Sequence, residues 1–164
     1  MAGELVIRRA VEGDLQRMAE LAGELVRLHH AADRSRFMLV DHVEEGYAWW
    51  LGRELRRSEA VLLVAHRGAL IVGYAYGTLE ERDWNLLLDA HGAVHDIFVE
   101  GDARGAGIGT KLVDAIVGEL ERLGAPRIVL STMVGNAAAK RLFARCGFRP
   151  TMLEMTRDAV ASRV

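Results

Sequence analysis

The amino-acid sequence predicts a single α+β domain over residues 1–164. In the first half of the chain, two stretches of helical periodicity precede a β-rich region, and in the second half strands alternate with helices. We expect a sheet that is mostly antiparallel in its first half and contains a strand–helix–strand unit in its second. A length of 164 residues is that of one domain, and 51% hydrophobic with 27% charged residues is typical of a soluble globular protein.

The first half is expected to hold a strand, two helices and a β-hairpin. Residues 5–7 form a short apolar strand, and from residue 14 to 30 apolar side chains recur at steps of three and four, as on one face of a helix. The side chains on that face are Leu15, Met18, Leu21, Ala22, Leu25, Leu28 and His29. After a polar loop, a second helix is expected over residues 40–57. Residues 61–79 are expected to form two strands joined by a tight turn around Gly68.

The second half alternates strands and helices. Residues 93–99 predict a strand bounded by glycines, and 107–123 a helix ended by Gly124 and Pro126. A strand over 127–132 and a short helix over 136–145 follow. Residues 148–156 are expected to form a final strand.

Composition excludes several classes of function. A net charge of −2 gives no general attraction to nucleic acid or to anionic membranes, so we expect neither as a partner. The opening residues lack the apolar core of a signal peptide, and no apolar run is long enough to span a bilayer. The single cysteine, Cys146, cannot form an internal disulfide, which suits a cytoplasmic protein. The scattered histidines offer no zinc-type ligand cluster, so no metal is expected.

The most informative stretch is a glycine-rich turn between an apolar strand and a helix. It has the pattern R-G-x-G-x-G from Arg104 to Gly109. The first turn of a helix has backbone N–H groups without partners and a partial positive charge, and glycines let an anion approach that backbone closely. Neither the dinucleotide fingerprint nor the phosphate-binding P-loop fits, because the glycines are wrongly spaced and Lys111 follows a threonine. The turn therefore predicts a phosphate site of another kind.

A second motif lies downstream of the turn. Asn136 is followed by an alanine three residues on, an aromatic residue seven residues on, and then Gly147-Phe148. The two motifs, over residues 94–150, resemble the GNAT superfamily of acetyl-CoA-dependent N-acetyltransferases. The resemblance implies the GNAT fold, a mixed and mostly antiparallel central sheet of six to seven strands flanked by about four helices.

The resemblance also implies where acetyl-CoA binds. The backbone of residues 97–99 would pair with the pantetheine arm as an added strand, and N–H groups of residues 104–110 would hold the pyrophosphate. Asn136 would bind the pantetheine arm or order the splayed strands, and it would also suit the cap of a helix. The cofactor-binding residues expected are Ile97, Phe98, Val99, Arg104, Gly105, Ala106, Gly107, Ile108, Gly109, Thr110, Asn136 and Phe143.

Two residues before the glycine-rich turn are candidates for the catalytic base. An alkylamine is protonated at neutral pH, with a pKa of about 10.4 for lysine, so acetyl transfer needs a group that removes a proton. His95 is the first candidate, because loosely similar diamine acetyltransferases have a glutamate in a position that resembles it. Asp96 is the second, because strand alternation would direct it to the opposite face unless a β-bulge intervened. His91 and His95 have the spacing of a helical metal pair, but the surrounding sequence is β-rich.

The residue at the position of the usual general acid differs from the one that many family members have. Many GNAT members have a tyrosine that protonates the departing thiolate where this chain has Phe143. A thiol with a pKa of about 8.5 leaves as a thiolate near neutral pH, so catalysis is still possible. Water, Tyr74, Tyr76 or Cys146 could take over the role.

The resemblance places the acceptor amine beside two polar loops, at residues 29–37 and 78–92. Acidic or histidine side chains there could attract a cation, namely His29, His30, Asp33, Glu80, Glu81, Asp83 and Asp89. We expect acetyl transfer to a primary amine of a small molecule, such as a polyamine, an amino acid or an aminoglycoside-like compound. A protein amine as acceptor, or an acyl-CoA-binding module without turnover, stays open as an alternative, as does a homodimer.

Overall fold

The computed structural model describes residues 3–159, which form five strands, four α-helices and two short 3-10 helices. The strands are β1 (Leu5–Arg9), β2 (Ala60–Arg67), β3 (Leu70–Glu80), β4 (His91–Val99) and β5 (Ile128–Leu130). The α-helices are α1 (Leu15–Ala32), α2 (Val43–Glu54), α3 (Ile108–Arg122) and α4 (Ala137–Arg145). Two short 3-10 helices, η1 (Glu12–Asp14) and η2 (Gly101–Ala103), precede α1 and α3.

The strands form one mixed sheet in the order β1-β2-β3-β4-β5. The first four strands pair antiparallel, and β5 pairs parallel with β4 after the crossover through α3. The α+β class, the mixed sheet and the four α-helices agree with the prediction. The number of strands does not, because the described residues form five strands rather than six to seven.

The missing strand is the last one that the sequence predicts. Residues 149–159 contain neither helix nor strand and are exposed along their whole length. The apolar and β-compatible residues of this segment give it the composition of a strand, but a strand forms only when a neighbouring strand accepts its backbone hydrogen bonds. No strand among residues 3–159 does so.

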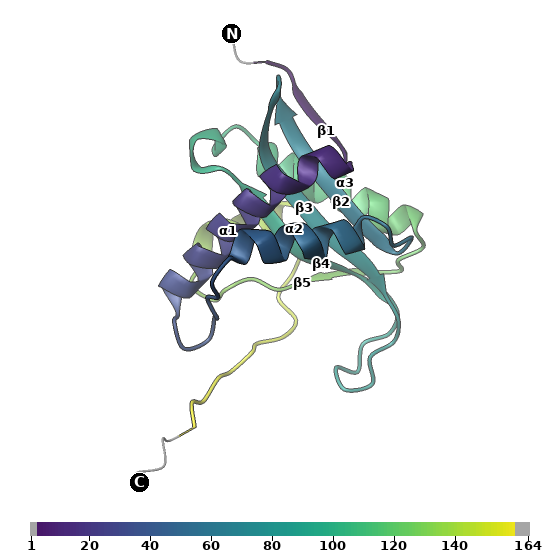
Figure 1. Ribbon diagram of the computed structural model, residues 1–164. Helices are drawn as coiled ribbons and strands as arrows, with labels where there is room; N and C mark the ends of the chain where they lie inside the picture. The colour runs from purple at the N-terminus through teal and green to yellow at the C-terminus, as the bar shows by residue number, and fades with distance from the viewer. Residues whose placement is uncertain (1–2, 160–164) are drawn as a thin grey trace.

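Helices cover both faces of the sheet (Figure 1). On one face α3 packs on a cluster of buried apolar side chains from β2, β3 and β4. On the other face α1 and α2 pack on a second cluster that includes Met18, Leu21, Leu51, Tyr74 and Phe98. Alternate residues of the central strands supply the two clusters, as the period of two in a strand requires.

Close packing of α3 on the sheet depends on glycines in the strands. A Cβ at Gly77 would lie 2.8 Å from the Ala93 carbonyl oxygen and 3.2 Å from side-chain atoms of Ile116 and Leu120. Any side chain there would push α3 away from β3. The second half of α3 thereby packs closely on β3.

Candidate active site

The gap between β4 and β5 is the first component of the site. The ladder between these strands pairs only Gly92–Val94 with Ile128–Leu130. Beyond Val94, β4 continues to Val99 without a strand beside it on the β5 side, within the described part of the chain. The strands therefore separate, and the backbone of residues 96–99 faces an opening. An extended ligand that carries amide groups can pair with such a backbone edge as an added strand does.

The glycine-rich turn lies at the end of that gap. Gly105 and Gly107 have φ values of 83° and 74°, which glycine adopts without strain. Gly107 is the N-cap of α3, and the first main-chain bond of the helix runs from the Lys111 N–H to the Gly107 carbonyl, at 3.2 Å. The N–H groups of residues 108–110 have no acceptor among residues 3–159. Together with the helix dipole, these free donors favour an anion.

Arg104 is fixed between the strand and the turn. Its Nε donates to the Val99 carbonyl at 2.8 Å, and its guanidinium lies 5.3 Å from the centre of the Phe98 ring. The cation therefore stands at the start of the turn, where a diphosphate would approach. The expected pairing of residues 97–99 with the pantetheine arm loses one acceptor, because the Val99 carbonyl already accepts a hydrogen bond from Arg104. The backbone polar groups of the preceding residues stay available for pairing.

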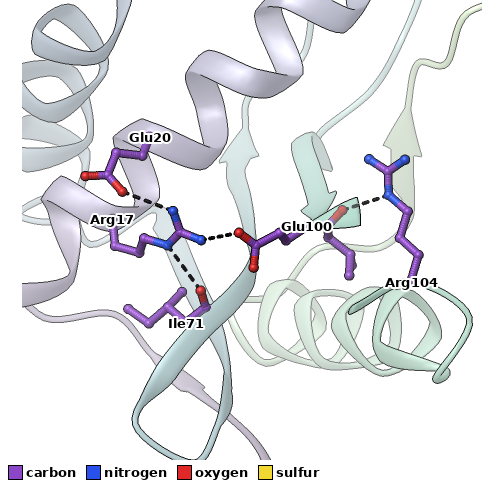
Figure 2. A network of polar contacts seen from close by, with 6 residues as sticks. Arg17, Glu20, Ile71, Glu100 and Arg104 are labelled. Atoms are coloured by element: carbon purple, nitrogen blue, oxygen red, sulfur yellow. Dashed lines mark hydrogen bonds and ion pairs between the residues drawn. The ribbon is translucent and has the colours of Figure 1, made fainter. Parts of the chain in front are cut away.

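A polar network connects the turn to α1 (Figure 2). Arg17 of α1 binds the carboxylate of Glu100 at 2.6 Å and that of Glu20 at 3.0 Å, and its Nε donates to the Ile71 carbonyl at 3.3 Å. Glu100 directly follows β4, so this network attaches the beginning of the turn to the helical layer. The sequence did not single out Arg17, since its partners lie 54 and 83 residues away.

A β-bulge decides where the two candidate bases point. Tyr76 pairs with Asp96 while the next residue, Gly77, pairs with Val94, so His95 is the extra residue. The His95 ring lies 5.0 Å from the Tyr76 ring, and Asp96 accepts a hydrogen bond of 3.0 Å from the Tyr74 hydroxyl. Both tyrosines belong to the core under α1 and α2. Strand alternation alone would direct Asp96 away from His95, but the bulge, the exception that the sequence analysis allowed for, puts both side chains on one face.

The His95 ring belongs to a short chain of hydrogen bonds. Thr78, which is fully buried, donates to the Glu80 carboxylate and lies 2.7 Å from Nε2 of His95. A hydroxyl has one proton, so Thr78 accepts from His95 when it donates to Glu80. In that arrangement Nε2 of His95 carries the proton and Nδ1 is free to accept one. Thr78 was not predicted, because its contact with His95 depends on the register between β3 and β4.

Asp96 is a half-buried carboxyl below α1 and α2. Burial raises its pKa, and this effect exceeds the opposing effects of the hydrogen bond from Tyr74 and of the nearby His95 and His29. Burial, together with the negative charge of Asp96, also raises the pKa of Tyr47 to about 12. A carboxyl with a raised pKa is better matched to accept a proton from an ammonium group than an ordinary aspartate.

A cavity of about 740 Å³ opens beside His95. The loop between β3 and β4 forms one wall and the β4–β5 junction forms the other. Among the side chains expected near the acceptor, Glu80, Glu81 and Asp83 line the cavity, whereas Asp89 forms an ion pair with Arg82 at 3.0 Å. The three carboxylates outnumber the one guanidinium of the lining, that of Arg82, and this excess of negative charge suits a cation.

The other residues expected near the acceptor lie elsewhere. His29 and His30 bind the carbonyl oxygens of Leu25 and Phe37, each at 2.8 Å, and neither lines the cavity. Asp33 accepts hydrogen bonds from Ser35 and from the backbone of the loop after α1. These contacts stabilise the end of α1 and its loop.

The second motif forms the start of α4 and part of its half-buried side. Asn136 is the N-cap, and its side chain accepts from the Ala139 N–H at 3.0 Å. Phe143 is half-buried and lies edge-on to Phe148, with ring centres 6.0 Å apart. The motif therefore has a structural role, because it caps and packs α4. A role in cofactor binding would be additional.

The candidates for a general acid differ in their burial and in whether their protons are already donated to hydrogen bonds. The Tyr74 hydroxyl donates to Asp96 and the Tyr76 hydroxyl donates to Glu54 at 2.6 Å. The pKa values of both tyrosines are raised, chiefly by burial. Burial also raises the pKa of Cys146, which lies at the C-cap of α4. Each of these groups holds its proton firmly, and the two tyrosine protons already have acceptors.

The described residues contain neither a cluster of metal ligands nor a membrane-spanning helix. Within residues 3–159, no three histidine, cysteine, aspartate or glutamate side chains come together as a metal site would require. None of the helices described is long and apolar enough to cross a bilayer.

Comparison with known proteins assigns the chain to a family. The sequence profile of the acetyltransferase (GNAT) family matches residues 24–148. That span includes the β4–β5 gap, the glycine-rich turn and α4. The chain belongs to the GNAT acetyltransferase family. The resemblance inferred from the two motifs is thus confirmed.

Relatives and solved structures agree with this assignment. An L-methionine sulfoximine/L-methionine sulfone acetyltransferase of Pseudomonas aeruginosa is 31% identical over 101 residues, which cover 60% of this chain and only 56% of that relative. A protein of the same name from Salmonella typhimurium is 30% identical over 152 residues, covering 90% of this chain and 81% of the relative. The structure of aminoglycoside N-acetyltransferase AAC(6′)-Iy in complex with CoA superposes with a TM-score of 0.79 at 15% identity, covering 98% of this chain and 97% of that one. This last likeness shows the shared GNAT fold.

Proposed function

We propose that this chain is an N-acetyltransferase that transfers an acetyl group from acetyl-CoA to the primary amine of a small molecule. One observation carries the proposal. The open backbone edge of β4 leads directly into free N–H donors at the start of α3, and His95 and Asp96 stand on the same strand beside a negatively charged cavity.

The residues present fit acetyl-CoA along its length. The edge at residues 96–98 would pair with the pantetheine amides, while the N–H groups of residues 105–110 and the Arg104 guanidinium would hold the diphosphate. Asn136 and Phe143 would flank the arm from α4. A backbone N–H at Phe98 or Val99 would stabilise the negative charge that develops on the thioester oxygen.

The acetyl group moves by attack of a neutral amine on the thioester carbonyl. His95 or Asp96 accepts the ammonium proton, directly or through one water, and the amine nitrogen then forms a bond to the carbonyl carbon. The bond from that carbon to sulfur breaks, and the electron pair leaves with sulfur as the CoA thiolate. The nitrogen loses its second proton to solvent, which leaves a neutral amide. Phe143 cannot supply a proton, so solvent protonates this thiolate after it departs.

The acidic cavity and the names of the relatives both support an amino-acid-like acceptor. The ammonium group of such an acceptor would be attracted by Glu80 and Glu81 and guided toward His95. Polyamines and aminoglycosides share the cationic amine and are the next acceptor classes to compare. We further propose that residues 1–164 act as one domain in the cytoplasm, without nucleic acid or a membrane as partner.

A thiol-release assay tests the proposal. Purified protein, acetyl-CoA and a panel of amines are incubated, and free CoA thiol is measured against a control without amine. The panel contains methionine sulfone, spermidine, an aminoglycoside and a lysine-containing peptide. We expect the highest kcat/KM for the amino-acid sulfone. Preference for the peptide would favour a protein amine as acceptor, and CoA binding without release for any amine would favour a non-catalytic acyl-CoA module.

A further inference from the structure

Three polar side chains form a chain of hydrogen bonds that begins at His95 and ends in the cavity. Thr78 and Glu80 are alternate residues of β3, so they share the face of the sheet on which the bulge places His95. Nε2 of His95 lies 2.7 Å from the Thr78 hydroxyl, and this hydroxyl is bound to the Glu80 carboxylate. Thr78 is fully buried, whereas the side chains of His95 and Glu80 are 42% and 40% exposed. Two groups of the cavity are thus joined through a hydroxyl that water does not reach.

The chemistry of the two ends determines the direction of these hydrogen bonds. A carboxylate can only accept, so the single hydroxyl proton of Thr78 is donated to Glu80. The hydroxyl oxygen then has only lone pairs to offer, and the ring of His95 must donate from Nε2. Neutral His95 therefore holds its proton on Nε2 and has a free lone pair on Nδ1. Among residues 3–159, no group is hydrogen-bonded to Nδ1.

Other polar groups lie near His95 without selecting its tautomer. The Tyr76 ring packs at 5.0 Å from the imidazole, but its hydroxyl donates to a carboxylate of α2. Asp96 acts on the ring only through its charge, because its hydrogen bond comes from Tyr74. The other charged or titratable residues of the cavity lining make no hydrogen bond or ion pair with the ring in the described part of the chain, namely Glu81, Arg82, Asp83 and His91.

This arrangement suits Nδ1 to take a proton from an ammonium group. Once Nδ1 is protonated, the ring is an imidazolium with a donor at each nitrogen. Its Nε2–H still donates to Thr78, and the Glu80 carboxylate supplies the opposite charge, with Oε1 3.8 Å from Nε2. None of the existing hydrogen bonds has to change when the proton arrives. A base that is oriented by a further group recurs in enzymes that activate a nucleophile.

We propose that Thr78 and Glu80 are positioning residues for His95, which hold its proton on Nε2, leave Nδ1 to accept the ammonium proton of the acceptor, and stabilise the imidazolium that results. This inference rests on the proposed acetyl transfer. The proton moves from the ammonium nitrogen to Nδ1, and the electron pair that it leaves on nitrogen forms the bond to the thioester carbon. The exposed imidazolium later returns the proton from Nδ1 to water. Thr78 and Glu80 keep their own protonation states throughout.

NMR of the ¹⁵N-labelled full chain at pH 8 tests the tautomer without any turnover. We expect a resolved signal from the Nε2–H of His95, because the buried Thr78 hydroxyl protects this proton from exchange with water, and an unprotonated Nδ1. His91 should show the reverse tautomer, since its Nδ1 lies 2.9 Å from the Asp89 carbonyl, which can only accept. The His95 signal should be lost in Thr78→Val and kept in Thr78→Ser. A native His95 protonated on Nδ1, or an unchanged His95 signal in Thr78→Val, would overturn the proposal.

Steady-state kinetics test whether this tautomer matters for acetyl transfer. Thr78→Val should lower kcat about 10- to 100-fold, which is part of the about 10² to 10⁴ that a general base contributes, and leave the KM for acetyl-CoA unchanged. Thr78→Ser restores the hydroxyl and should keep most of the native kcat. A folded Thr78→Val variant with the native kcat would contradict the role of the hydroxyl. So would an equal loss in Thr78→Ser, because that loss would follow from packing.

Glu80→Gln separates the charge of Glu80 from its hydrogen bond. The amide oxygen still accepts from Thr78, so the Nε2–H signal should remain, while kcat should fall because the imidazolium loses its counter-charge. Glu81→Gln removes the same charge from the cavity lining, so it should raise the KM for the amine and lower kcat less. In the Thr78→Val background, Glu80→Gln should cost much less, since the connection to His95 is already broken. Equal losses in both backgrounds would remove Glu80 from the positioning role.

Turnover by the native protein distinguishes this inference from the proposed function. A native protein that releases no CoA thiol with any amine contradicts the proposed function, and the NMR spectra still decide the tautomer of His95. A native protein that turns over as well as its Thr78→Val and Glu80→Gln variants do contradicts only the positioning roles.

Discussion

His95 and Asp96 leave β4 on the same face because the strand holds one residue more than its partner β3 at that point. The two side chains have different surroundings. His95 is in contact with solvent, Thr78 and the Tyr76 ring, whereas Asp96 lies deeper under the helices and accepts from Tyr74. One site therefore offers an accessible imidazole and a carboxyl with a raised pKa. Separate substitutions can tell which of them accepts the proton.

Replacing His95 tests the first candidate. General-base catalysis contributes about 10² to 10⁴ in rate, so His95→Ala should lower kcat on that scale while acetyl-CoA affinity is unchanged. His91→Ala is the matched control, because His91 lines the same cavity but its Nδ1 is bound to the Asp89 carbonyl at 2.9 Å. Steady-state kinetics and calorimetry on both variants provide the comparison. An equal loss of kcat in the two would remove His95 from the role of base.

Replacing Asp96 tests the effect of its burial on stability. A carboxyl whose pKa is raised on folding stabilises the protein only below its unfolded pKa of about 3.9, and this stabilisation is lost as the pH rises through the folded value. Asp96→Asn keeps an acceptor for the Tyr74 hydroxyl and has no charge to bury. It should therefore be more stable than the native protein at pH 8, and this advantage should shrink at pH 4.

Urea denaturation at the two pH values measures this difference in the free energy of unfolding. Asp114→Asn, at an exposed position of α3, serves as the control, and its stability relative to the native protein should not change in the same way. An Asp96→Asn variant that is less stable than the native protein at pH 8 would contradict the inference that burial of the ionised Asp96 carboxylate lowers the free energy of unfolding.

At the scale of elements, α3 is anchored at its start by a turn whose backbone requires glycine. Its two flanking glycines, Gly107 before the helix and Gly124 after it, have φ values of 74° and 98°. A Cβ at either position would meet nothing within 4 Å. The two positions therefore carry similar backbone strain on substitution, but only Gly107 lies where the diphosphate is expected.

The similar backbone conformations of these two glycines provide a matched pair of variants. Gly107→Val should weaken CoA binding at least tenfold, or by about 1.4 kcal/mol, because the new side chain occupies the approach to the free N–H groups. Gly124→Val should lose a similar amount of stability and bind CoA normally. Calorimetry on the two folded variants measures the affinities. Equal affinities would place the cofactor away from the start of α3.

The whole molecule should respond to the ligand as one cooperative unit. The gap between β4 and β5 is bounded by the sheet and leads to the start of α3, so a ligand bound there favours the folded state of these elements. At a CoA concentration 100 times its Kd, the expected stabilisation is about 2.7 kcal/mol. For a chain of this size that corresponds to a rise in Tm of roughly 5–10 °C.

Differential scanning calorimetry with and without CoA measures this rise, with adenosine diphosphate as a comparison ligand that lacks the pantetheine arm. We expect a smaller rise with adenosine diphosphate at equal concentration. A transition that splits in two, with only one part shifted by CoA, would show that residues 1–164 do not unfold as a single domain.

Local sequence patterns predicted most of the elements and the position of the glycine-rich turn. The period of the apolar residues between 14 and 30 and the spacing from Arg104 to Gly109 depend only on neighbours along the chain. α1 and the start of α3 lie within a few residues of where these patterns placed them. Such features are readable because helix periodicity, capping and positive φ are properties of short segments.

The tertiary structure decided three features that no local pattern contains. The bulge at His95 depends on the register with β3, and the contact of Arg17 with Glu100 joins residues 83 apart in sequence. Residues 148–156 have the composition of a strand and still form none, because no neighbouring strand of this chain accepts their hydrogen bonds. Sequence alone determined which segments can become helices, strands and a glycine-rich turn. Pairing and packing between distant segments decided which face each side chain occupies and which strands find a partner, since those energies arise only when the segments meet.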